Sequence, residues 1–458
     1  MKYNYKNKTV AILGLARSGV AAAKLLLEEG AHVYVSDAAD NEILRERAKE
    51  LVKLGAKVEL GGHGDEMLGQ IDEIIVSPGV PKDIPILLWF KSNRTELPII
   101  SEIELAYRFA KGKIIGITGS NGKSTTVSMV GALFEAAGYE TNVVGNIGIA
   151  MSEIVLTASE DSVLCVELSS FQLDSIVDFH PDVACLLNLT PDHLDRHYDV
   201  ETYYGAKFNI FRNQTNEDYA ILNISDAKVA SCGQSVNSKI LWFSNSEIDR
   251  PGVFIREDKL FLRKPDGNEI EIMATKEINV PGSHNLANAC AAVACSIPFG
   301  IPTEIIAKAL REFQGLPHRL QLVGSLNGIR FINDSKATNV DSLECALRSF
   351  TEDVVLIAGG YDKGADFSPL RDLVRERVKH VVLIGATADR IAGEWSEATA
   401  IEKAADLEEA IYKAHTAAKS RGIVLLAPGC ASYDMFDNFE HRGEQFTEIV
   451  LRLIGKMK

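Results

Sequence analysis

The stretch IIGITGSNGKSTT, residues 114–126, constrains the fold more than any other part of the chain. An apolar β-branched run ends at a glycine-rich turn, and a helix is expected to restart at Ser124. Such a turn directs several backbone N–H groups into one concavity at the positive end of a helix dipole, where phosphate binds. In the P-loop pattern G-x-x-x-x-G-K-[ST], Lys123 would reach the terminal phosphates and the Ser124 hydroxyl would bind Mg²⁺. Ile117 stands where that pattern has its first glycine, so a turn without nucleotide remains an alternative.

Short apolar runs alternate with helix-length amphipathic segments along the chain, which is the pattern of parallel α/β domains. The chain has 458 residues, and at about 150 residues per domain we expect three domains. We place them at residues 1–108, 109–312 and 313–458. Short strands with polar flanks, between about residues 220 and 282, predict a small β extension of the second domain. Ligands bind at the carboxyl ends of strands in open parallel sheets, so residues at strand ends are the candidate site residues.

Composition and charge disfavour several classes of function. The 63 acidic residues outnumber the 48 basic ones, and the resulting net charge of −15 repels nucleic acid and anionic membranes. The N-terminus enters a predicted strand without an apolar signal segment, and no run of about 18 apolar residues follows. The 7 cysteines are dispersed without a C-x-x-C pair, which argues against disulfides and zinc. We expect a cytoplasmic monomer that neither binds nucleic acid nor inserts into a membrane.

The first predicted strand ends in a glycine-rich turn of its own. GLARSG is one glycine short of the Rossmann fingerprint, and Asp37 ends the next apolar run. A nucleotide diphosphate at this helix N-terminus, with Asp37 near its ribose or base, fits NAD or a nucleotide sugar. A turn that only packs is the alternative. The run IIVSPGVP adds a second turn at the same sheet edge, and the candidate contacts from both turns are Gly14, Leu15, Ala16, Arg17, Ser18, Ser77, Pro78 and Gly79.

Two strand ends of the second domain carry side chains that can bind metal. The run SVLCVEL ends at Glu167, and a carboxylate beside a phosphate loop can hold Mg²⁺. The run VACLLNL is followed by TPDHLDRH, in which His193 and His197 are four residues apart. A zinc protease motif needs glutamate at the position of Leu194, so that hypothesis fails. His193, flanked by aspartates in the domain of the phosphate loop, remains a candidate site residue.

Nine segments in chain order resemble the Mur ligase family. They are GITGSNGKST, ELSSFQLD, NLTPDHLDRH, YYGAKFNIF, GSHNLANA, LPHRLQ, INDSKATN, GGYDKGADFS and APGCASYDMFDNFEHRGEQF. Within the family they are most similar to the ligases that add D-glutamate to UDP-N-acetylmuramoyl-L-alanine in peptidoglycan precursor synthesis. The resemblance implies a Rossmann-like domain for UDP, a central ATPase domain and a C-terminal Rossmann-like domain for the amino acid. It also implies that ATP phosphorylates a substrate carboxylate and that an amine attacks the acyl phosphate through a tetrahedral intermediate.

The resemblance assigns roles to residues and implies ATP and two Mg²⁺ ions as cofactors. The catalytic residues would be Lys123, Glu167, His193, Lys207 and Lys336. The metal ligands would be Ser124, Glu167, His193 and an N-carboxylated (carbamylated) Lys207. ATP would contact Gly119, Ser120, Asn121, Gly122, Lys123, Ser124, Thr125, Asn285, Arg319 and Asp334. The precursor would contact Asn146, Ser169 and His193, and the amino acid would contact Thr338, Lys363, Ser432, Tyr433 and Phe439.

Some of these assignments depend on the resemblance alone. By pattern, YYGAKFNIF is a half-buried helix whose Lys207 extends its ammonium group to solvent. Tyr433 stands where leucine is expected, which leaves only a backbone N–H role there. The two carboxylates of glutamate favour a pocket of cations and hydroxyls, as in Lys336, Lys363 and Ser432.

Other functions stay open at this point. A nicotinamide-dependent oxidoreductase, suggested by GLARSG, would leave the GKS loop unexplained. A nucleotide switch without catalysis is a second alternative. Within the family, the nearest alternative is a ligase that adds a different amino acid to a UDP-muramoyl precursor. The glycine-rich first domain favours D-glutamate, because the ligases for diaminopimelate or lysine usually lack that turn and the folate polyglutamate ligases lack that domain.

Overall fold

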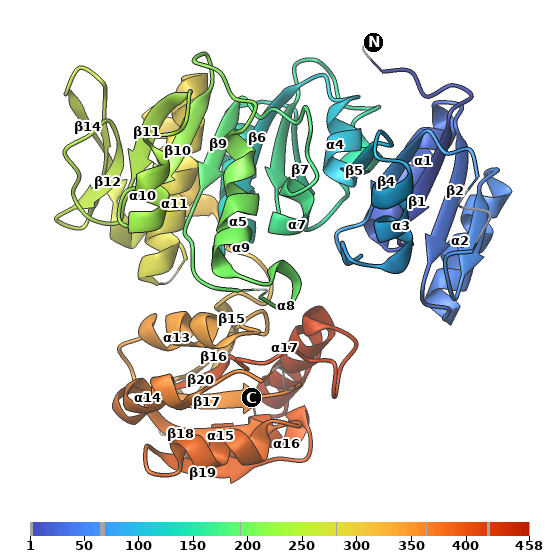
Figure 1. Cartoon of the computed structure of the whole chain (residues 1–458). Coiled ribbons are helices and arrows are strands. Elements are labelled where there is room, and N and C mark those ends of the chain that lie inside the picture. The colour runs from blue at the N-terminus through green and yellow to red at the C-terminus, as the bar shows by residue number, and fades with distance from the viewer. Residues whose placement is uncertain are drawn as a thin grey trace. The chain divides into compact units, whose positions relative to one another are not determined.

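The computed structural model describes residues 3–64, 69–192, 194–280, 282–361, 364–418 and 422–457. The chain divides into two compact units. The first comprises Met1–Glu277 and Ala287–Arg311, and the second comprises Ile278–Leu286 and Glu312–Lys458. Figure 1 labels their helices and strands, which build three separate sheets. The predicted three-domain α/β architecture is confirmed.

The five-stranded sheet of the first unit is parallel throughout, with the order β3-β2-β1-β4-β5. Its strands are β1 (Thr9–Leu13), β2 (His32–Asp37), β3 (Lys57–Leu60), β4 (Glu73–Val76) and β5 (Ile99–Ser101). Its helices are α1 (Arg17–Glu28), α2 (Glu42–Lys53), α3 (Pro85–Asn93) and α4 (Glu102–Tyr107). Because the strand order reverses at β1, the turns after β1 and β4 open at one switch point, where ligands bind in such sheets.

The nine-stranded sheet of the first unit has the order β14-β13-β12-β11-β10-β9-β6-β8-β7. Its strands are β6 (Lys113–Thr118), β7 (Thr141–Gly145), β8 (Val163–Glu167), β9 (Val183–Leu186), β10 (Tyr219–Asn223), β11 (Lys239–Phe243), β12 (Gly252–Arg256), β13 (Lys259–Arg263) and β14 (Glu269–Ala274). Strands β8 and β9 are buried along their whole length, because a parallel strand covered on both faces needs a continuous apolar sequence. Strands β12 to β14 pair antiparallel and form the predicted β extension.

Helices follow most strands of this sheet. They are α5 (Lys123–Ala136), α6 (Met151–Ile154), α7 (Ser170–Leu173), α8 (Leu194–His197), α9 (Val200–Phe208), α10 (Ala227–Cys232), α11 (Ser283–Ser296) and α12 (Thr303–Glu312), with short 3₁₀ turns at Asn209–Phe211, Thr275–Glu277 and Ile297–Phe299. Helix α5 begins directly after the phosphate loop, as the sequence predicts, and most of its residues are buried.

Buried carboxylates on α4 tie the two sheets of the first unit together. Glu104 accepts the backbone N–H groups of Val177 (2.9 Å), Asp178 (3.0 Å) and Phe179 (2.8 Å). Glu102 accepts the N–H of Ser152 at 2.7 Å, and burial raises the pKa of the Glu102 carboxyl. Helix α1 also packs on α6. The glycine-rich turns of the first sheet are therefore held firmly beside the loops of the second.

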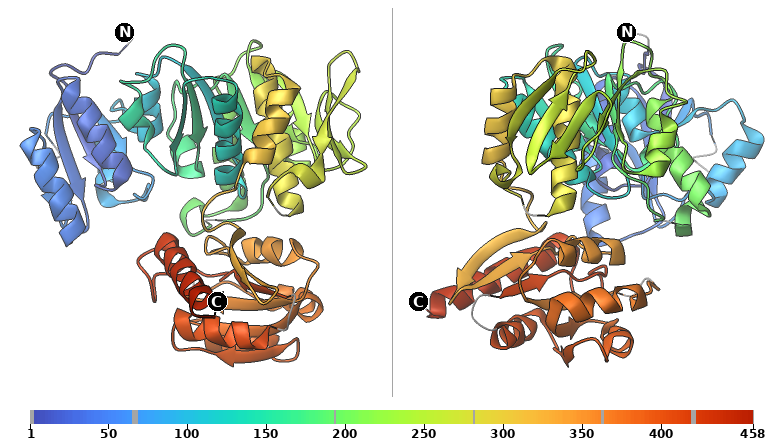
Figure 2. Two further views of the ribbon diagram at one scale, coloured as in Figure 1. Left: turned by 180° about the vertical axis from the view of Figure 1, so that it is seen from behind. Right: turned by 90° about the vertical axis from the view of Figure 1, so that its left-hand side faces the viewer.

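The six-stranded sheet of the second unit has the order β15-β16-β20-β17-β18-β19, with only β15 and β16 antiparallel. Its strands are β15 (Gln321–Leu326), β16 (Ile329–Asn333), β17 (Val354–Gly359), β18 (Val378–Ile384), β19 (Ala400–Lys403) and β20 (Ile423–Leu426). Its helices are α13 (Val340–Arg348), α14 (Arg371–Arg377), α15 (Ala388–Trp395), α16 (Leu407–Ala417) and α17 (Phe439–Met457), with a 3₁₀ turn at Ser368–Leu370. Helices α13, α14 and α15 share one core and α16 and α17 another, so both faces of the sheet are covered (Figure 2).

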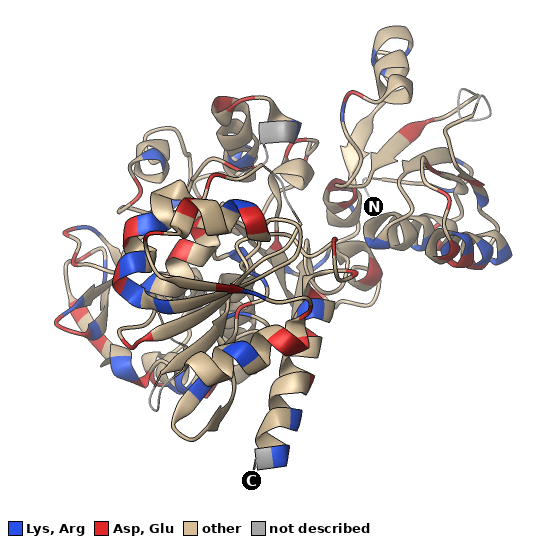
Figure 3. Ribbon diagram, turned by 90° about the horizontal axis from the view of Figure 1, so that it is seen from below, with Lys and Arg blue, Asp and Glu red and all other residues tan. Residues whose placement is uncertain are grey.

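Composition predicted that the chain neither inserts into a membrane nor binds nucleic acid. No helix in the described ranges combines the length and the apolar sequence that crossing a membrane requires. Acidic and basic residues alternate along the surface helices (Figure 3), as in the segment EILRERAKELVK of α2.

Candidate active site

The phosphate loop between β6 and α5 is held by the end of β9. The Asn121 N–H donates to Asn188 Oδ1 (2.8 Å), and Asn188 Nδ2 donates back to the Asn121 carbonyl (3.0 Å). The Ser120 N–H donates to the Asn188 carbonyl at 3.0 Å, and Ser120 Oγ donates to the carbonyl of Thr190 at 2.8 Å. Asn188 therefore shapes the loop, although the sequence predicted no role for it in the site.

Gly122 precedes the first residue of α5 and has a φ of 86°, in the left-handed region. A Cβ atom at this position would lie 2.4 Å from Asn288 Oδ1. Only glycine fits both the backbone and the space, and this lets the chain turn sharply into the helix. The predicted sharp turn from the glycine-rich loop into the N-terminus of α5 is present.

Two lysines meet at this loop. Lys123 Nζ donates to the carbonyls of Gly119 (2.9 Å) and Ser120 (2.8 Å). Lys207 Nζ, from α9, also donates to the Gly119 carbonyl (2.8 Å) and lies 4.7 Å from the ring centroid of Tyr203. The Lys207 side chain is fully buried and does not extend to solvent, contrary to what its helix pattern alone suggested. Burial first, and the charge of Lys123 second, hold the pKa of Lys207 well below its ordinary value.

Glu167 lies at the tip of β8 and is clamped by Asn146. Asn146 Nδ2 donates to Glu167 Oε1 at 2.9 Å, and the Asn146 backbone N–H donates to the Glu167 carbonyl at 2.9 Å. Glu167 Oε2 is buried and has no hydrogen-bond partner among the described residues. A buried carboxylate oxygen without a donor is suited to a cation.

The predicted donors for Mg²⁺ are Ser124, Glu167, His193 and a carbamylated Lys207. Among the described residues, no cluster of three or more His, Cys, Asp or Glu side chains could hold a metal ion. The buried Ser124 hydroxyl and Glu167 are hard oxygen donors that fit this ion. His193 lies outside the described residues. A carbamate on Lys207 would add a further oxygen donor.

The two predicted turns of the first sheet lie together. Ser77 Oγ donates to the Gly14 carbonyl at 3.0 Å, which links the turn after β4 to the turn after β1. The carboxylate of Asp37 accepts the N–H of Leu15 at 2.7 Å. An Arg17 guanidinium N–H donates to the Asn146 carbonyl at 3.2 Å, so the first turn also reaches the residue that clamps Glu167.

The second unit collects the predicted nucleotide residues Arg319 and Asp334, near Asn285. Burial raises the pKa of Asp334 to about 6, against the opposing charge of Arg319 and a hydrogen bond from the Leu320 N–H. His284, which the sequence did not predict as a site residue, lies within the field of Arg319, and burial followed by that charge lowers its pKa to about 4. Leu320 has a φ of 41°, the kind of strained backbone that occurs at functional loops.

The described residues predicted to bind the amino acid lie on two neighbouring segments. Thr338 follows β16, and Ser432, Tyr433 and Phe439 follow β20. The Gly429 N–H donates to the Ala337 carbonyl at 2.8 Å and joins the loops after β16 and β20. Lys336 Nζ lies 4.8 Å from the ring centroid of Phe439. On the same loops, Thr338 is half-buried, Ser432 is buried and Tyr433 is exposed; Lys363 lies outside the described residues.

A buried arginine that sequence reasoning missed holds these two loops. Arg442 donates to Ser335 Oγ (2.9 Å), to the Ser335 carbonyl (2.7 Å) and to the carbonyls of Cys430 (3.2 Å) and Ala431 (3.4 Å). Burial lowers its pKa to about 10, so it stays charged at neutral pH. The segment HRGEQF gave no signal that its arginine points into the protein.

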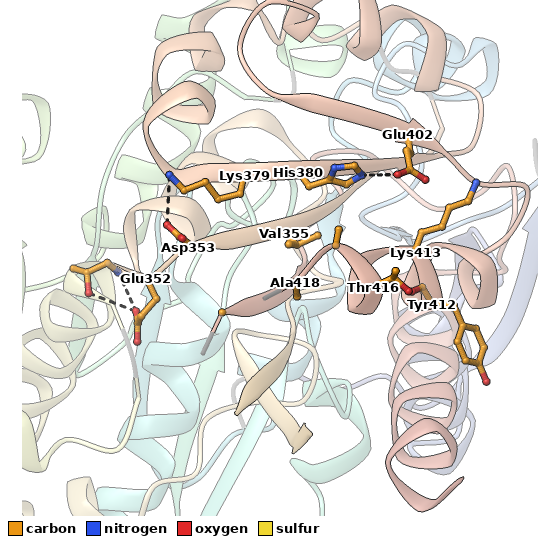
Figure 4. A pocket seen from close by; sticks show the side chains of 13 residues that line it. Glu352, Asp353, Val355, Lys379, His380, Glu402, Tyr412, Lys413, Thr416 and Ala418 are labelled. Carbon is orange, nitrogen blue, oxygen red and sulfur yellow. Dashed lines mark hydrogen bonds and ion pairs between the residues drawn. The ribbon is translucent and has the colours of Figure 1, made fainter. Parts of the chain in front are cut away.

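A cavity of about 1070 Å³ in the second unit lies away from these loops (Figure 4). It is lined by residues at the starts of β17, β18 and β20, whereas ligands bind at the carboxyl ends of such strands. Two polar pairs line it: Lys379 Nζ lies 3.5 Å from Asp353 Oδ1, and His380 Nε2 lies 3.2 Å from Glu402 Oε1. We do not include this cavity in the candidate site.

Comparison with known proteins assigns the chain to a family. Residues 8–98 match the model of the Mur ligase MurD-like N-terminal domain, residues 117–296 the Mur ligase middle domain, and residues 318–430 the Mur ligase glutamate ligase domain. The chain belongs to the Mur ligase family. The match to the Mur ligase middle domain covers most of the phosphate loop, Glu167 and Lys207.

Individual Mur ligases are similar over almost the whole chain. The UDP-N-acetylmuramoylalanine–D-glutamate ligase of Alkaliphilus oremlandii is 43% identical over 98% of this chain and 99% of its own. The enzyme of the same name from Clostridioides difficile is 41% identical over 98% and 99%. Among solved structures, UDP-N-acetylmuramate-alanine ligase MurC from Thermotoga maritima is 20% identical with a TM-score of 0.60, covering 97% of this chain and 99% of its own. The likeness to the solved structure supports the fold alone, whereas the sequence identity to the two ligases also supports membership of the family.

Proposed function

We propose that this protein ligates D-glutamate to UDP-N-acetylmuramoyl-L-alanine and converts ATP to ADP and phosphate. The observation that carries this proposal is the 43% identity to a ligase of that name over 98% of the chain. The geometry agrees with it, because a phosphate loop, the Lys123 ammonium group and a buried carboxylate suit phosphoryl transfer to a carboxylate. An oxidoreductase would leave the phosphate loop and Lys207 without a role.

The reaction has two steps. In the first, an oxygen of the precursor carboxylate attacks the γ-phosphorus, the bond to ADP breaks, and an acyl phosphate forms. Lys123 would exchange its two loop carbonyls for phosphate oxygens and stabilise the charge on the transferring group. Glu167 and Ser124 would hold Mg²⁺, which neutralises phosphate charge when bound. Asn146 keeps Glu167 Oε1 engaged, so Oε2 would be the oxygen available to hold the ion.

In the second step, the amine nitrogen of D-glutamate attacks the acyl carbon. The tetrahedral intermediate collapses when the carbon–oxygen bond to phosphate breaks, and the nitrogen loses a proton. We assign the amino acid to the loops that carry Lys336, Thr338, Lys363, Ser432 and Phe439, with a backbone N–H at Tyr433. His193 and Ser169 remain assigned to the precursor and metal side of the first unit.

Lys207 is proposed to act as a carbamate. A buried lysine with a lowered pKa is more often a neutral amine, and its nitrogen lone pair can add to CO₂. The new N–C bond gives N-carboxylysine and the nitrogen releases one proton, so a neutral amine becomes an anion. An anion beside Glu167 would attract a second Mg²⁺ ion, which an ammonium group would repel.

Several expectations complete the proposal. The domain boundaries at residues 1–108, 109–312 and 313–458 are kept as the functional division. Asn285, Arg319 and Asp334 are assigned to the nucleotide. We expect the enzyme to be a monomer, and we expect it in the cytoplasm because its precursor, ATP and the amino acid are all polar metabolites.

Phosphate release tests the function. The enzyme is supplied with ATP, Mg²⁺ and UDP-N-acetylmuramoyl-L-alanine, and amino acids are added one at a time. We expect turnover with D-glutamate and background rates with L-alanine, L-lysine and diaminopimelate. Comparable turnover with a diamino acid would favour the other Mur ligase function instead.

A further inference from the structure

Arg196 joins the two sheets of the first unit at a place that the proposed mechanism does not use. Its guanidinium donates to three consecutive carbonyl oxygens in the loop after β4, those of Pro78 (3.3 Å), Gly79 (3.3 Å) and Val80 (3.0 Å). Arg196 itself belongs to α8, 116 to 118 residues further along the chain. A guanidinium presents its donors in a rigid planar fork, so one side chain that holds three carbonyls fixes the shape of that loop.

Stacked rings hold Arg196 in position. Its guanidinium lies 4.5 Å from the ring centroid of Phe171. That ring stacks on His197, with centroids 5.0 Å apart and an interplanar angle of 6°. His197 is buried, and its ring centroid lies 5.4 Å from the ring centroid of Tyr203. Lys207 Nζ lies over the same Tyr203 ring. The side chain that shapes the loop of the first sheet therefore rests on residues packed around the phosphate loop.

The contacts of Arg196 set the direction of a loop donor. The C=O and N–H groups of a trans peptide point in opposite directions, and the described peptides are all trans. Because the Pro78 carbonyl faces Arg196, the Gly79 N–H points away from the guanidinium. A cation on the carbonyl polarises the peptide and makes its N–H a stronger donor to an anion.

We propose that Arg196 is a positioning residue for the UDP precursor. It holds residues 77–80 in the shape in which the Gly79 N–H binds the anionic nucleotide part of the substrate. The N–H groups of Ser77 and Val80 are already bonded to the carbonyls of Leu13 and Ser77. Because it acts from behind the loop, it need not touch the substrate. This inference rests on the proposed assignment of Ser77, Pro78 and Gly79 to the precursor.

The variants R196Q and R196K test the proposal by steady-state kinetics and by calorimetric titration with UDP-N-acetylmuramoyl-L-alanine. We expect the KM and Kd for this precursor to rise about tenfold in both variants, because neither side chain can hold three carbonyls as a planar fork. The KM for ATP should change by less than about twofold, since the phosphate loop keeps its own contacts. Melting curves followed by circular dichroism check that each variant is folded, and R196K carries the test if R196Q unfolds.

A matched control removes another link between the same two sheets. Tyr198 is exposed, and its hydroxyl donates to Asp83 at 2.7 Å without touching residues 77–80. Y198F should leave the affinity for the precursor unchanged. An R196K variant with the affinity of the wild type, equal losses for ATP and precursor in R196Q, or a Y198F variant as weak as R196Q would each overturn the proposal.

The variant D37A tests the underlying site separately. If D37A binds the precursor as tightly as the wild type, the assignment of the nucleotide to the turns of the first sheet is wrong, whatever Arg196 does. If D37A binds the precursor more weakly than the wild type, and R196Q and R196K bind it as tightly, the nucleotide site is supported and the positioning role of Arg196 is wrong.

Discussion

Lys207 and Lys123 donate to the same acceptor, the carbonyl oxygen of Gly119, at 2.8 and 2.9 Å. Two ammonium groups on one oxygen repel each other, and Lys207 also loses its hydration because it is buried. Both effects lower the pKa of Lys207, burial more than the neighbouring charge. The phosphate loop thus favours a neutral amine at Lys207, which is the form that reacts with CO₂.

Lys207 should destabilise the folded protein when bicarbonate is absent. A lysine whose pKa is lower in the folded than in the unfolded state loses protons on folding, so stability rises with pH between the two pKa values. In bicarbonate-free buffer at pH 7, K207M should therefore melt at a higher temperature than the wild type and should show a weaker rise of stability towards pH 10. K228M, at an exposed lysine of α10, should change neither quantity. A lower melting temperature of K207M would contradict the assigned desolvation cost.

Activity should depend on a negative charge at position 207. We expect K207A to lose most activity, and K207E, shorter than a carbamate but anionic, to retain more than K207A. Removing bicarbonate should slow the wild type, and adding it back should restore the rate, whereas K207E should respond to neither change. Initial rates of phosphate release measure these effects. Equal rates for K207A and the wild type would exclude the carbamate.

Lys123 should matter for the chemical step. K123A removes a cation from the transferring phosphoryl group and should lower kcat on the order of 10²-fold or more. The variant K113A is a suitable control. Lys113 is largely exposed at the start of β6, the strand that leads into the phosphate loop, and it pairs with Asp182 at 2.7 Å. Rapid-quench measurement of acyl phosphate formation would show whether the loss lies in the first step. A kcat of K123A within about threefold of the wild-type kcat would show that Lys123 takes no part in the chemical step.

Arg442 should control the affinity for the amino acid. R442M leaves the carbonyls of Ser335 and Cys430 without their donor, which is costly for buried groups and should release the loop that carries Ser432. We expect a rise of about tenfold in the KM for D-glutamate and a lower melting temperature. R452A, on the same helix, removes only a surface pair with Glu408 at 2.7 Å and should change little. Unchanged kinetics of R442M would mean that Arg442 contributes to packing only and does not affect the binding of the amino acid.

His284 should remain neutral in moderately acidic solution. Its pKa of about 4 lies below the ordinary value of 6.5, so the unfolded state binds more protons in that interval and stability falls as the pH drops from 6.5 to 4. H284N should flatten this part of the stability curve. In R319Q the pKa of His284, followed by NMR titration, should rise towards the ordinary value, but only partly, because burial is the larger cause. A His284 pKa near 6.5 in the wild type would contradict the described environment.

The sequence by itself determined the local units. The phosphate loop, the turn GLARSG with Asp37, and the strand that ends at Glu167 are each made by a few adjacent residues. Their geometry depends on neighbouring backbone angles and on alternation of apolar residues, both of which are legible along the chain. The parallel sheets and the β extension followed from the same patterns.

Only the tertiary structure decided which charged side chains are buried and what they hold. Lys207 and Arg442 lie on helices whose patterns also fit surface positions, yet Lys207 donates across 88 residues and Arg442 to Ser335 across 107. Arg196 reaches carbonyls more than a hundred residues away. A hydrophobic pattern fixes which face of a helix is buried but not which distant backbone oxygens lie against it, because those partners come together only when the sheets are packed.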